Sequence, residues 1–529
     1  MHPPRTRPVR RVTSLLAWSP ALGLVAALPA SGASAAGVVA GVSTATPVTA
    51  APVTSTPVRA ATVTVPDDLR VHQTRTSLLG THRWYQQLRN NRVVYDGWYA
   101  THTDAQGNVT VWDGRRDVSE VSATSATMSL AQVLDDAASA ADATAADVVD
   151  SSLLILPADR PTGEAHLAWA VHTTTGRGAA TTFVDAEDGT ILDVVETASE
   201  KSAPTTQPDG TRETFSVTGR GRVFDPNPVV KLQNQSLRDR NDSNAAVPAR
   251  GYTVVNLPRL SADHTLLGKW VRITNADRAT SPENRYFFRR AAGRFEQVTA
   301  YHAIDAQQHY LQTLGFTDVN AEAQQVKVNA FAADNSYYDS VVDKISLGRG
   351  GVDDAEDPEV LWHEFGHAIQ SDQVPGWGFR GQTGAMGEGF GDYIAVTMSQ
   401  ATSRNTARTP AACVMDWDAT SYTRRTPHCL RRTDRSKSFP DDLTGQVHAD
   451  GEIWSRALWD INRKLGRDRA TRIIVEAQFW MNPQSRMPAA ARTTVKAAEG
   501  LYDAEVAAKV RHQFVNRGIL EPVETVAGH

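Results

Sequence analysis

The feature that most constrains this 529-residue chain is a helical segment, residues 360–369, that carries His363, Glu364 and His367 in the arrangement His-Glu-x-x-His. Two residues four apart on an α-helix stand about 40° from each other around the axis and one turn apart along it. The two imidazoles therefore converge on one point, as two nitrogen ligands of a zinc ion do. Glu364 follows the first histidine, where it can reach a water on the metal without binding the metal itself.

The residues just before this motif predict where its helix begins. Asp357 is a good N-cap, Pro358 suits the first helical position, and Glu359 suits the positive end of the helix dipole. The alternative is an ordinary amphipathic helix whose histidines and glutamate pack against or pair with neighbours. Because so short a motif recurs by chance, the rest of the chain has to supply its context.

Length and composition favour several globular domains. A hydrophobic fraction of 41%, with 12 Trp, 12 Tyr and 14 Phe, can fill real cores. The net charge of -5 is small for this length, and no basic block is interleaved with aromatic residues. We therefore expect no nucleic-acid partner.

The N-terminus has the pattern of an export signal. Four arginines lie between positions 5 and 11, residues 15–28 are mostly apolar, and small residues follow at 33–36. The apolar run is too short, and too broken by Pro20, to favour a spanning helix over a cleaved signal. Residues 1–36 are thus a predicted signal peptide, and the protein is expected to be secreted and extracellular, with no membrane anchor after cleavage.

A small α+β domain is expected after a linker. Residues 37–62 are dominated by Ala, Val, Thr, Pro and Ser with one charge, Arg59, and predict a low-complexity linker without a core. The periodicity that follows ends near residue 200. It predicts two strands over 85–98 joined by a turn at Asn90-Asn91, a helix over 130–149, strands over 165–171, 180–184 and 191–195, and a turn at 187–190.

Two stretches of this domain resemble known propeptides. Residues 77–87, Ser-Leu-Leu-Gly-Thr-His-Arg-Trp-Tyr-Gln-Gln, resemble the start of the propeptide domain that precedes fungalysin and thermolysin-type proteases, and residues 183–192 resemble the closing strands of the associated PepSY-type domain. The resemblance implies that residues 63–205 are a folding helper and an intramolecular inhibitor; an independent binding module is the alternative. Residues 201–210 are rich in Pro and Gly and suit proteolytic cleavage.

A third zinc ligand is needed, because a catalytic zinc site usually has three protein ligands and leaves one position to water. Glu388, 21 residues after His367, lies in the stretch Met-Gly-Glu-Gly-Phe-Gly-Asp. Asp392, four residues later on the same helical face, can accept a hydrogen bond from the metal-distal N–H of a histidine ligand. So much glycine in a helix, at about 1 kcal/mol each relative to Ala, implies that another backbone or the metal comes close.

This stretch resembles the second motif of fungalysins, in which the glutamate is the third zinc ligand. Phe390 and Gly391 stand where Trp and Ser are commoner. The resemblance implies one catalytic Zn²⁺ held by His363, His367 and Glu388. Aminopeptidases of the gluzincin group use similar ligands with a shorter gap, beside an exopeptidase signature that this sequence lacks.

A third constellation, residues 445–454, resembles the fungalysin segment whose histidine faces the zinc across the cleft. His448 would then hydrogen-bond the oxyanion formed when water adds to a peptide carbonyl. Asp441, Asp442 and Asp450 are all candidates to orient its ring, and the sequence does not choose between them. A helix-capping histidine is the alternative.

Residues 334–339 resemble the edge-strand motif on which thermolysin-type enzymes lay the backbone of their substrate. Asn335 and Ser336 are the expected substrate-binding residues, with Ser336 in place of the usual Ala. An edge strand offers unpaired N–H and C=O groups to an extended peptide. An ordinary hairpin turn is the alternative.

Three further features are less specific. Thermolysin also offers a Tyr to the oxyanion, but no Tyr lies between His367 and Glu388. Arg431 and Arg432 are candidate donors to a substrate carbonyl. The only two cysteines of an exported chain are expected to pair. These cysteines are Cys413 and Cys429. An acidic cluster could bind Ca²⁺, but we favour a solvated cap; it consists of Asp353, Asp354, Glu356 and Asp357. A helix is expected over 296–314, and for its two histidines, His302 and His309, we favour packing over metal binding.

Together these patterns predict an α+β protein, and the resemblance to fungalysins implies a thermolysin-like, two-lobed zincin catalytic domain. Its β-rich N-terminal lobe would span residues 206–372 and its helical C-terminal lobe residues 373–529, after the small α+β propeptide. The predicted function is that of a secreted zinc-dependent endopeptidase, made as a latent precursor, that acts on proteins or peptides. The alternatives are a secreted binding protein with a structural or degenerate zinc site, and a zinc exopeptidase.

Overall fold

The computed structural model describes residues 56–59, 63–118, 121, 125–159, 163–197 and 214–522. The predicted signal peptide, most of the predicted linker and the predicted cleavage stretch at 201–210 lie outside these residues. The described chain is a mixed α+β structure, as the sequence predicted. Within it, no helix combines the length and apolar character needed to cross a bilayer.

The first sheet of the N-terminal region, by which we mean the described residues up to 197, is an antiparallel meander. Its strands are β2 (Leu69–Thr76), β3 (Gly80–Arg89), β4 (Arg92–Asp104) and β5 (Asn108–Gly114). Asn90 and Asn91 join β3 to β4 with φ of 50° and 60°, which two-residue hairpin turns require, so the predicted hairpin is confirmed. Four residues of the expected linker form a strand instead: β1 (Thr56–Arg59) pairs with β5.

The second sheet of this region is joined to the first by one parallel pairing, between Val94 and Ile155. Helix α1 packs on its face. The predicted helix over 130–149 is too long, because Asp142 adopts φ 54° after α1 and the β-branched pair Val148-Val149 begins a strand. The elements are α1 (Leu130–Ala140), β6 (Val148–Leu156), β7 (His166–Thr175), β8 (Gly178–Asp185) and β9 (Ile191–Glu196).

The C-terminal region, residues 214–522, begins with two small sheets and one long helix. In one sheet β10 (Val217–Val223) lies between β11 (Thr253–Leu260) and β13 (Arg285–Tyr286). The other has the order β12 (Val271–Ile273), β14 (Gln324–Lys327), β16 (Lys344–Leu347), β15 (Ser336–Asp339), which places β15 at its edge as predicted.

Helix α3 (Arg294–Thr313) is the predicted helix over 296–314 and is buried along most of its length. Its two histidines make packing and polar contacts: His309 stacks on the Trp270 ring, and His302 Nε2 lies 3.6 Å from Asp225 Oδ2. Neither belongs to a group of convergent metal-ligating side chains among the described residues.

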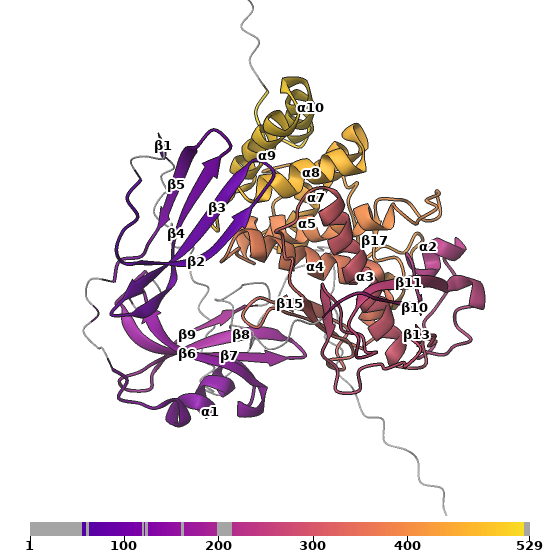
Figure 1. Ribbon diagram of the computed structural model, residues 1–529, viewed down its shortest axis with the longest axis horizontal. Helices are drawn as coiled ribbons and strands as arrows, with labels where there is room; N and C mark the ends of the chain where they lie inside the picture. The colour runs from indigo at the N-terminus through magenta and orange to yellow at the C-terminus, as the bar shows by residue number, and fades with distance from the viewer. Residues whose placement is uncertain are drawn as a thin grey trace, which may run out of the picture. The chain divides into compact units, whose positions relative to one another are not determined.

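Six longer helices follow, and they bring the predicted motifs together. Helix α5 packs against both α4 and α7 (Figure 1). Phe365, Phe390 and Trp454, one from each of these helices, belong to one buried cluster with the aromatic residues of the preceding sheets. The helices are α4 (Pro358–Gln373), α5 (Gly381–Ser399), α7 (Val447–Leu465), α8 (Arg467–Gln478), α9 (Met487–Leu501) and α10 (Ala504–Val515); shorter elements are α2 (Pro228–Leu232), the 3-10 turn η4 (Asp354–Glu356), β17 (Cys413–Val414), α6 (Ala419–Tyr422) and β18 (Arg431–Arg432).

Buried polar contacts join the two regions at the end of α4 and at α8. Arg75 Nε lies 3.0 Å from both carboxylate oxygens of Asp372, which is fully buried at the C-terminal end of α4. Glu476 on α8 accepts hydrogen bonds of 2.8 Å from the Ser77 hydroxyl and from the Leu78 N–H. The two regions are thus held by charge and hydrogen bonds as well as by apolar packing.

Two further contacts between the regions reach β15. His172 Nε2 lies 3.0 Å from Asp339 Oδ2, and both side chains are buried. The Tyr337 hydroxyl donates to the Thr175 carbonyl at 3.0 Å. The end of the β7–β8 hairpin therefore lies against the strand that the sequence predicted to receive substrate.

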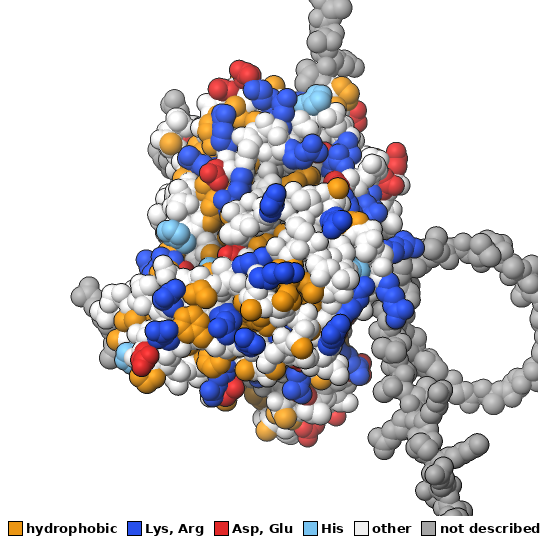
Figure 2. Space-filling model, turned by 90° about the vertical axis from the view of Figure 1, so that its right-hand side faces the viewer, with side chains coloured by type: hydrophobic (Ala, Val, Ile, Leu, Met, Phe, Trp, Pro, Cys, Tyr) orange, Lys and Arg blue, Asp and Glu red, His pale blue; other side chains and the backbone are white. Residues whose placement is uncertain are grey.

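Many acidic side chains of the C-terminal region lie in the interior of the protein. On the face drawn in Figure 2, Lys and Arg side chains are prominent and Asp and Glu are sparse, although the net charge of the whole chain is -5. Many carboxylates of the C-terminal region are instead buried: Glu296, Asp305, Asp339, Asp353, Asp354, Glu356, Asp357, Glu359, Glu364, Asp372, Asp392, Asp416, Asp418, Asp450, Glu452 and Glu476.

Candidate active site

Helix α4 begins as its sequence predicts. The Asp357 carboxylate accepts a 3.1 Å hydrogen bond from the Glu359 N–H, and Pro358 occupies the first turn. Every residue of the helix is buried, so its polar side chains point into the protein rather than into solvent. His363, Glu364 and His367 are only 3%, 6% and 7% exposed.

The structure brings the three predicted zinc ligands together. His363 Nε2 lies 3.1 Å from His367 Nε2 and 3.3 Å from Glu388 Oε2, and His367 Nε2 lies 3.6 Å from Glu388 Oε1. One ligand atom from each side chain lies within 4.8 Å of the other two. Two turns of α4 and one of α5 therefore point at a single spot.

These donors fit a zinc ion. The two imidazole Nε2 atoms and the Glu388 carboxylate face one another at 3.1–3.6 Å, so ligand atoms from three side chains point at one spot. Two histidines and one glutamate are the ligands of one common type of catalytic zinc site. These three side chains can thus supply the protein ligands of a zinc ion.

Asp392 lies behind His363, as predicted. Its Oδ1 is 3.0 Å from His363 Nδ1, which leaves Nε2 of that ring directed at Glu388. Burial raises the pKa of Asp392, but the charges and hydrogen bonds of Arg431 and His363 outweigh it and bring the pKa to about 2. Burial lowers the pKa of His363, and its bonds to Asp392 and Glu388 outweigh that and raise it to about 9.

Arg431 is bound to Asp392. Its Nε lies 3.0 and 2.8 Å from the two carboxylate oxygens, and its Nη2 lies 2.7 Å from Oδ1. The sequence had offered Arg431 and Arg432 as donors to a substrate carbonyl. The structure instead uses the Nε and Nη2 groups of Arg431 on Asp392, and it pairs Arg432 with Asp434 at 2.6 Å.

A disulfide holds the hairpin that presents Arg431. β17 pairs with β18 so that Val414 faces Arg431, and the Cys413–Cys429 bridge links the two arms. The predicted disulfide is therefore confirmed. Because the bridge lies two residues before Arg431, it restricts the backbone that carries the guanidinium to the predicted zinc ligands.

The glycines of α5 permit close approaches, as their number predicted. A Cβ added to Gly391 would lie 2.6 Å from His363 Nδ1, and one added to Gly389 would lie 2.6 Å from the Gly451 carbonyl oxygen. The first contact lets α5 lie against a ligand ring, and the second lets it lie against the backbone of α7. Any larger residue at either position would push these elements apart.

Glu364 is buried beside these ligands. Burial raises its pKa to about 7, with a further increase from the Glu388 charge and an opposing effect of His363. The backbone of Tyr338 in β15 hydrogen-bonds its carboxylate. Glu364 therefore lies between the ligands and the predicted substrate strand.

His448, the second residue of α7, faces the ligands from the opposite side. Its Nε2 lies 3.2 Å from Glu388 Oε2, and its side chain remains 27% exposed. The Gln446 amide donates to His448 Nδ1 at 2.9 Å. An Nδ1 that accepts a hydrogen bond leaves the proton on Nε2, the nitrogen that faces Glu388.

Gln446 is a contact that the sequence analysis missed. Asp450, one of the three predicted orienting residues, accepts hydrogen bonds from the Thr444 and Gly445 N–H groups and so holds the loop before α7. Asp442 accepts a hydrogen bond from the Ser438 N–H. Gln446 also accepts from the Ala449 N–H as the N-cap of α7, and this capping position was the available sequence signal.

The predicted substrate-binding residues lie at the start of β15. The Asn335 carbonyl accepts a 3.0 Å hydrogen bond from the Gly348 N–H, and the Ser336 hydroxyl donates to Asp354. β15 pairs only with β16 among the described strands, so its other edge is not part of a sheet.

The matching family is fungalysin. Residues 351–471, which contain every predicted zinc-site residue from His363 to His448, match the family described as Fungalysin metallopeptidase (M36). The chain is similar to the fungalysin metallopeptidases over these residues. No curated protein sequence matches the chain.

Two solved structures are distantly similar to this fungalysin-like chain. The precursor of protealysin, a metalloproteinase from Serratia proteamaculans, is 17% identical with a TM-score of 0.35, over 42% of this chain and 79% of that one. The Bacillus megaterium YpeB C-terminal domain is 13% identical with a TM-score of 0.17, over 25% of this chain and 57% of that one.

The acidic cluster before α4 is not the solvated cap that we expected. Asp353 and Asp354 are 6% and 3% exposed, and Glu356 and Asp357 are fully buried. Their carboxylates have separate partners, because Asp357 caps α4, Asp354 bonds Ser336 and Glu356 meets an arginine. The four side chains therefore do not share one cation.

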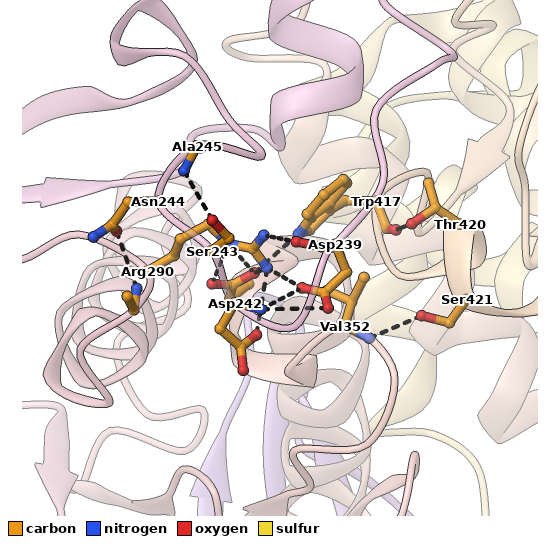
Figure 3. A network of polar contacts seen from close by, with 12 residues as sticks. Asp239, Asp242, Ser243, Asn244, Ala245, Arg290, Val352, Trp417, Thr420 and Ser421 are labelled. Carbon is orange, nitrogen blue, oxygen red and sulfur yellow. Dashed lines mark hydrogen bonds and ion pairs between the residues drawn. The ribbon is translucent and has the colours of Figure 1, made fainter.

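That arginine is Arg290, which is fully buried in a polar network (Figure 3). Its Nε lies 2.9 Å and 3.1 Å from the two oxygens of Glu356, and its Nη1 donates to the Asp239 carbonyl at 2.7 Å. Trp417 Nε1 donates to the same Glu356 at 3.2 Å. In this fungalysin-like region an internal guanidinium thus neutralises part of the buried acid.

Proposed function

We propose that this chain is the precursor of a secreted zinc-dependent endopeptidase. The observation that carries the proposal is the convergence of His363, His367 and Glu388 beside the buried Glu364. The similarity of residues 351–471 to fungalysin metallopeptidases supports it. We further propose that residues 206–372 and 373–529 form the two lobes of a thermolysin-like catalytic domain, with the zinc ligands on α4 and α5.

When bound by these three side chains, zinc would supply a Lewis acid that polarises a peptide carbonyl and acidifies a water molecule. Glu364 accepts the proton of that attacking water and then gives it to the leaving amine, as a general base and acid. In support of this role, the Glu364 carboxylate is buried beside the proposed ligands. Asp392, fixed by Arg431, orients the His363 ring so that Nε2 is the ligand atom.

His448 stabilises the developing oxyanion in this proposal. Its Nε2 carries a proton, because Nδ1 accepts from Gln446, and it faces the ligands across 3.2 Å. One such donor is typically worth about 2.7–4 kcal/mol of transition-state stabilisation. With no Tyr between His367 and Glu388, His448 is the donor that we assign to this role.

The edge of β15 is the proposed binding site for the substrate backbone. An extended peptide that adds to a free strand edge makes main-chain hydrogen bonds that do not depend on its sequence. Asn335 and Ser336 at the start of the strand would then contact the peptide. Such binding suits cleavage within a protein chain, as expected of an endopeptidase.

Residues 63–205, which include most of the N-terminal region, are the proposed propeptide and inhibitor. Supporting this, His172 and Thr175 contact Asp339 and Tyr337 of β15, the strand proposed to bind substrate. The purified precursor should therefore cleave protein substrates far more slowly than the same protein after its N-terminal region has been removed. Equal rates would contradict the inhibitory role.

The substitution Glu364→Gln tests the mechanism. We expect zinc content to stay near that of the parent while casein hydrolysis falls by about 10²–10⁴-fold, the usual contribution of a general base. Glu505→Gln, on the exposed surface of α10, is the matched control and should not change the rate. Persistent casein cleavage by the Glu364 variant would refute the assignment.

Chelation separates the alternatives. A binding protein with a structural zinc site would show no hydrolysis that a chelator abolishes and zinc restores. An exopeptidase would cut only peptides with a free terminus, whereas the proposed endopeptidase cuts peptides blocked at both ends.

A further inference from the structure

Among the described residues, three groups of acidic or histidine side chains converge closely enough to hold a metal ion. The first is the zinc site of the proposed enzyme. The second is Asp239, Asp242 and Glu356, and the third is Asp334, Asp354 and Asp418. The second and third groups differ in how their negative charge is balanced, and this difference identifies the third as a cation site.

The second group already contains a cation. Arg290 Nη2 lies 2.5 Å from Glu356 and 3.6 Å from Asp242, and it also contacts Asp239. Figure 3 shows Arg290 in this network together with Asp239 and Asp242. A fixed internal positive charge at this spot leaves no need for a metal ion there.

The third group has no such charge. Within the described part of the chain, no Lys or Arg forms an ion pair with Asp334, Asp354 or Asp418. The one arginine that acts on Asp418 from a distance is Arg431, which is bound to Asp392. Three clustered carboxylates are therefore left without a neutralising side chain.

Asp418 adds independent support for a missing partner. Its side chain is only 3% exposed, and its Oδ1 has no hydrogen-bond partner among the described residues. A buried carboxylate oxygen with nothing to accept from is costly, and such atoms are rare unless an ion or water binds them. Because a ligand oxygen of Asp418 lies within 4.8 Å of those of Asp334 and Asp354, the carboxylate is directed into the group.

The surrounding structure holds the other two carboxylates in place. Asp334 Oδ1 accepts a 2.6 Å hydrogen bond from the Tyr422 hydroxyl, and Asp354 accepts from Ser336. A Cβ on Gly351, whose φ is 65°, would lie 2.3 Å from Asp334 Oδ2, so only glycine lets this carboxylate occupy its position. Each acid is thus oriented by neighbours that leave other lone pairs free.

The pKa values show that these carboxyl groups are costly to ionise where they lie, first because they are buried and then, for Asp354 and Asp418, because other carboxylates lie near them. Burial and the neighbouring carboxylates raise the pKa values of Asp354 and Asp418 well above the usual range. Burial raises the pKa of Asp334 to about 6, against the opposing bond from Tyr422. A bound divalent cation would remove both the repulsion and much of the cost of burying the charge.

We propose that Asp334, Asp354 and Asp418 form a calcium site separate from the zinc ligands. All three ligands are carboxylates, and the hydroxyls of Ser336 and Tyr422 lie beside them, which is the all-oxygen environment that Ca²⁺ prefers and zinc does not. Calcium accepts six to eight oxygen ligands in irregular geometry, so water can complete the shell.

The position of the site gives the ion a structural purpose. Asp334 lies just before β15, Asp354 begins η4 immediately before α4, and Asp418 is the N-cap of α6. A shared ion would therefore tie the strand proposed to bind substrate to the start of the zinc helix and to the segment after β17. Calcium should protect this junction from heat and from proteolysis.

The experiment compares Asp418→Asn with Asp242→Asn in the full chain, both in the Glu364→Gln background so that the protein does not digest itself. Bound calcium is measured by equilibrium dialysis, zinc by elemental analysis, and thermal unfolding is recorded in calcium-free buffer and at 10 mM CaCl₂. The parent and the Asp242 variant should bind one Ca²⁺ per chain at this site with a Kd on the order of 10⁻⁴–10⁻³ M, and calcium should raise their unfolding midpoint by about 1–3 °C.

The Asp418 variant should bind one calcium ion fewer and lose the calcium-dependent rise in midpoint, with its zinc content unchanged. In calcium-free buffer it should unfold at the same temperature as the parent or higher, because the substitution removes a repelling charge; this arm also shows that the variant folds. The proposal is overturned if calcium leaves the parent unchanged, if Mg²⁺ but not Ca²⁺ produces the effect, or if the Asp242 variant loses calcium as well.

Discussion

The contact between Asp392 and Arg431 predicts that zinc affinity and stability respond differently to substitution. Asp392→Asn removes the carboxylate behind His363 and leaves Arg431 unpaired, whereas Arg431→Met leaves the contact to His363 in place. The double variant removes both charges. The three proteins therefore separate the orientation of the zinc ligand from the energetics of a buried ion pair.

The magnitudes follow from the burial of the two side chains, which are 1% and 11% exposed. The pKa of Asp392 is about 2 rather than 3.8, a difference worth about 2 kcal/mol in favour of the folded state at neutral pH. Removing one partner of a buried pair costs about 3–5 kcal/mol in other proteins. We expect each single substitution to lower the free energy of unfolding by about 2–5 kcal/mol and the double substitution to lower it by clearly less than the sum.

Zinc affinity should follow a different order. Loss of a carboxylate that orients a ligating histidine typically costs about 10–100-fold in metal affinity. Asp392→Asn and the double variant should both show this loss, while Arg431→Met should show a smaller one because Asp392 remains.

The assay uses the full chain with Glu364→Gln. Urea unfolding of the metal-free protein gives stability, and competition with a chromophoric chelator gives zinc affinity. Zinc affinity within threefold of the parent in Asp392→Asn would refute the orienting role, and additive losses of stability would refute the buried pair.

Two further predictions concern other parts of the chain. Burial lowers the pKa of His102 to about 3, and burial and His102 lower that of His82, so the folded state holds both rings neutral beside Ser77 while the unfolded chain binds protons below about 6.5. The free energy of unfolding is thus highest above about pH 6.5 and falls as the pH decreases. At pH 5 the protonation of His102 in the unfolded chain alone should lower it by about 2 kcal/mol. The urea unfolding midpoint should therefore be lower at pH 5.0 than at pH 7.5, and His102→Leu should reduce this difference. Replacing Cys413 and Cys429 by Ser, which opens a bridge between residues 16 apart, should lower the free energy of unfolding by about 3 kcal/mol; an unchanged thermal midpoint would contradict a stabilising bridge.

Local signals predicted the elements that depend on neighbours in sequence. The start of α4 follows from Asp357 and Pro358, and the hairpin at Asn90-Asn91 follows from two residues that tolerate positive φ. The predicted helix over 130–149 was too long because its Ala-rich start and its Val-rich end have opposite preferences, and the strand pairing of β6 with β7 decides between them.

Contacts between distant segments could not be predicted in the same way. The sequence showed that Asp353, Asp354, Glu356 and Asp357 are close in number, but not that Arg290 lies against Glu356 or that Asp354 joins Asp334 and Asp418. The placement of Arg431 on Asp392 depends likewise on how β17 packs against α5 and β18 against α7.

The contacts of Asp372 and Glu476 with the N-terminal region imply that the C-terminal region folds with support that it lacks after the N-terminal region is removed. If that region is removed after folding, Asp372 loses Arg75 and keeps the Asn320 N–H, and Glu476 loses the Ser77 hydroxyl and the Leu78 N–H. Both carboxylates exchange protein donors for water. The trimmed protein would then lack contacts that were present while the chain folded, so it should unfold at a lower temperature than the precursor and refold less readily once unfolded.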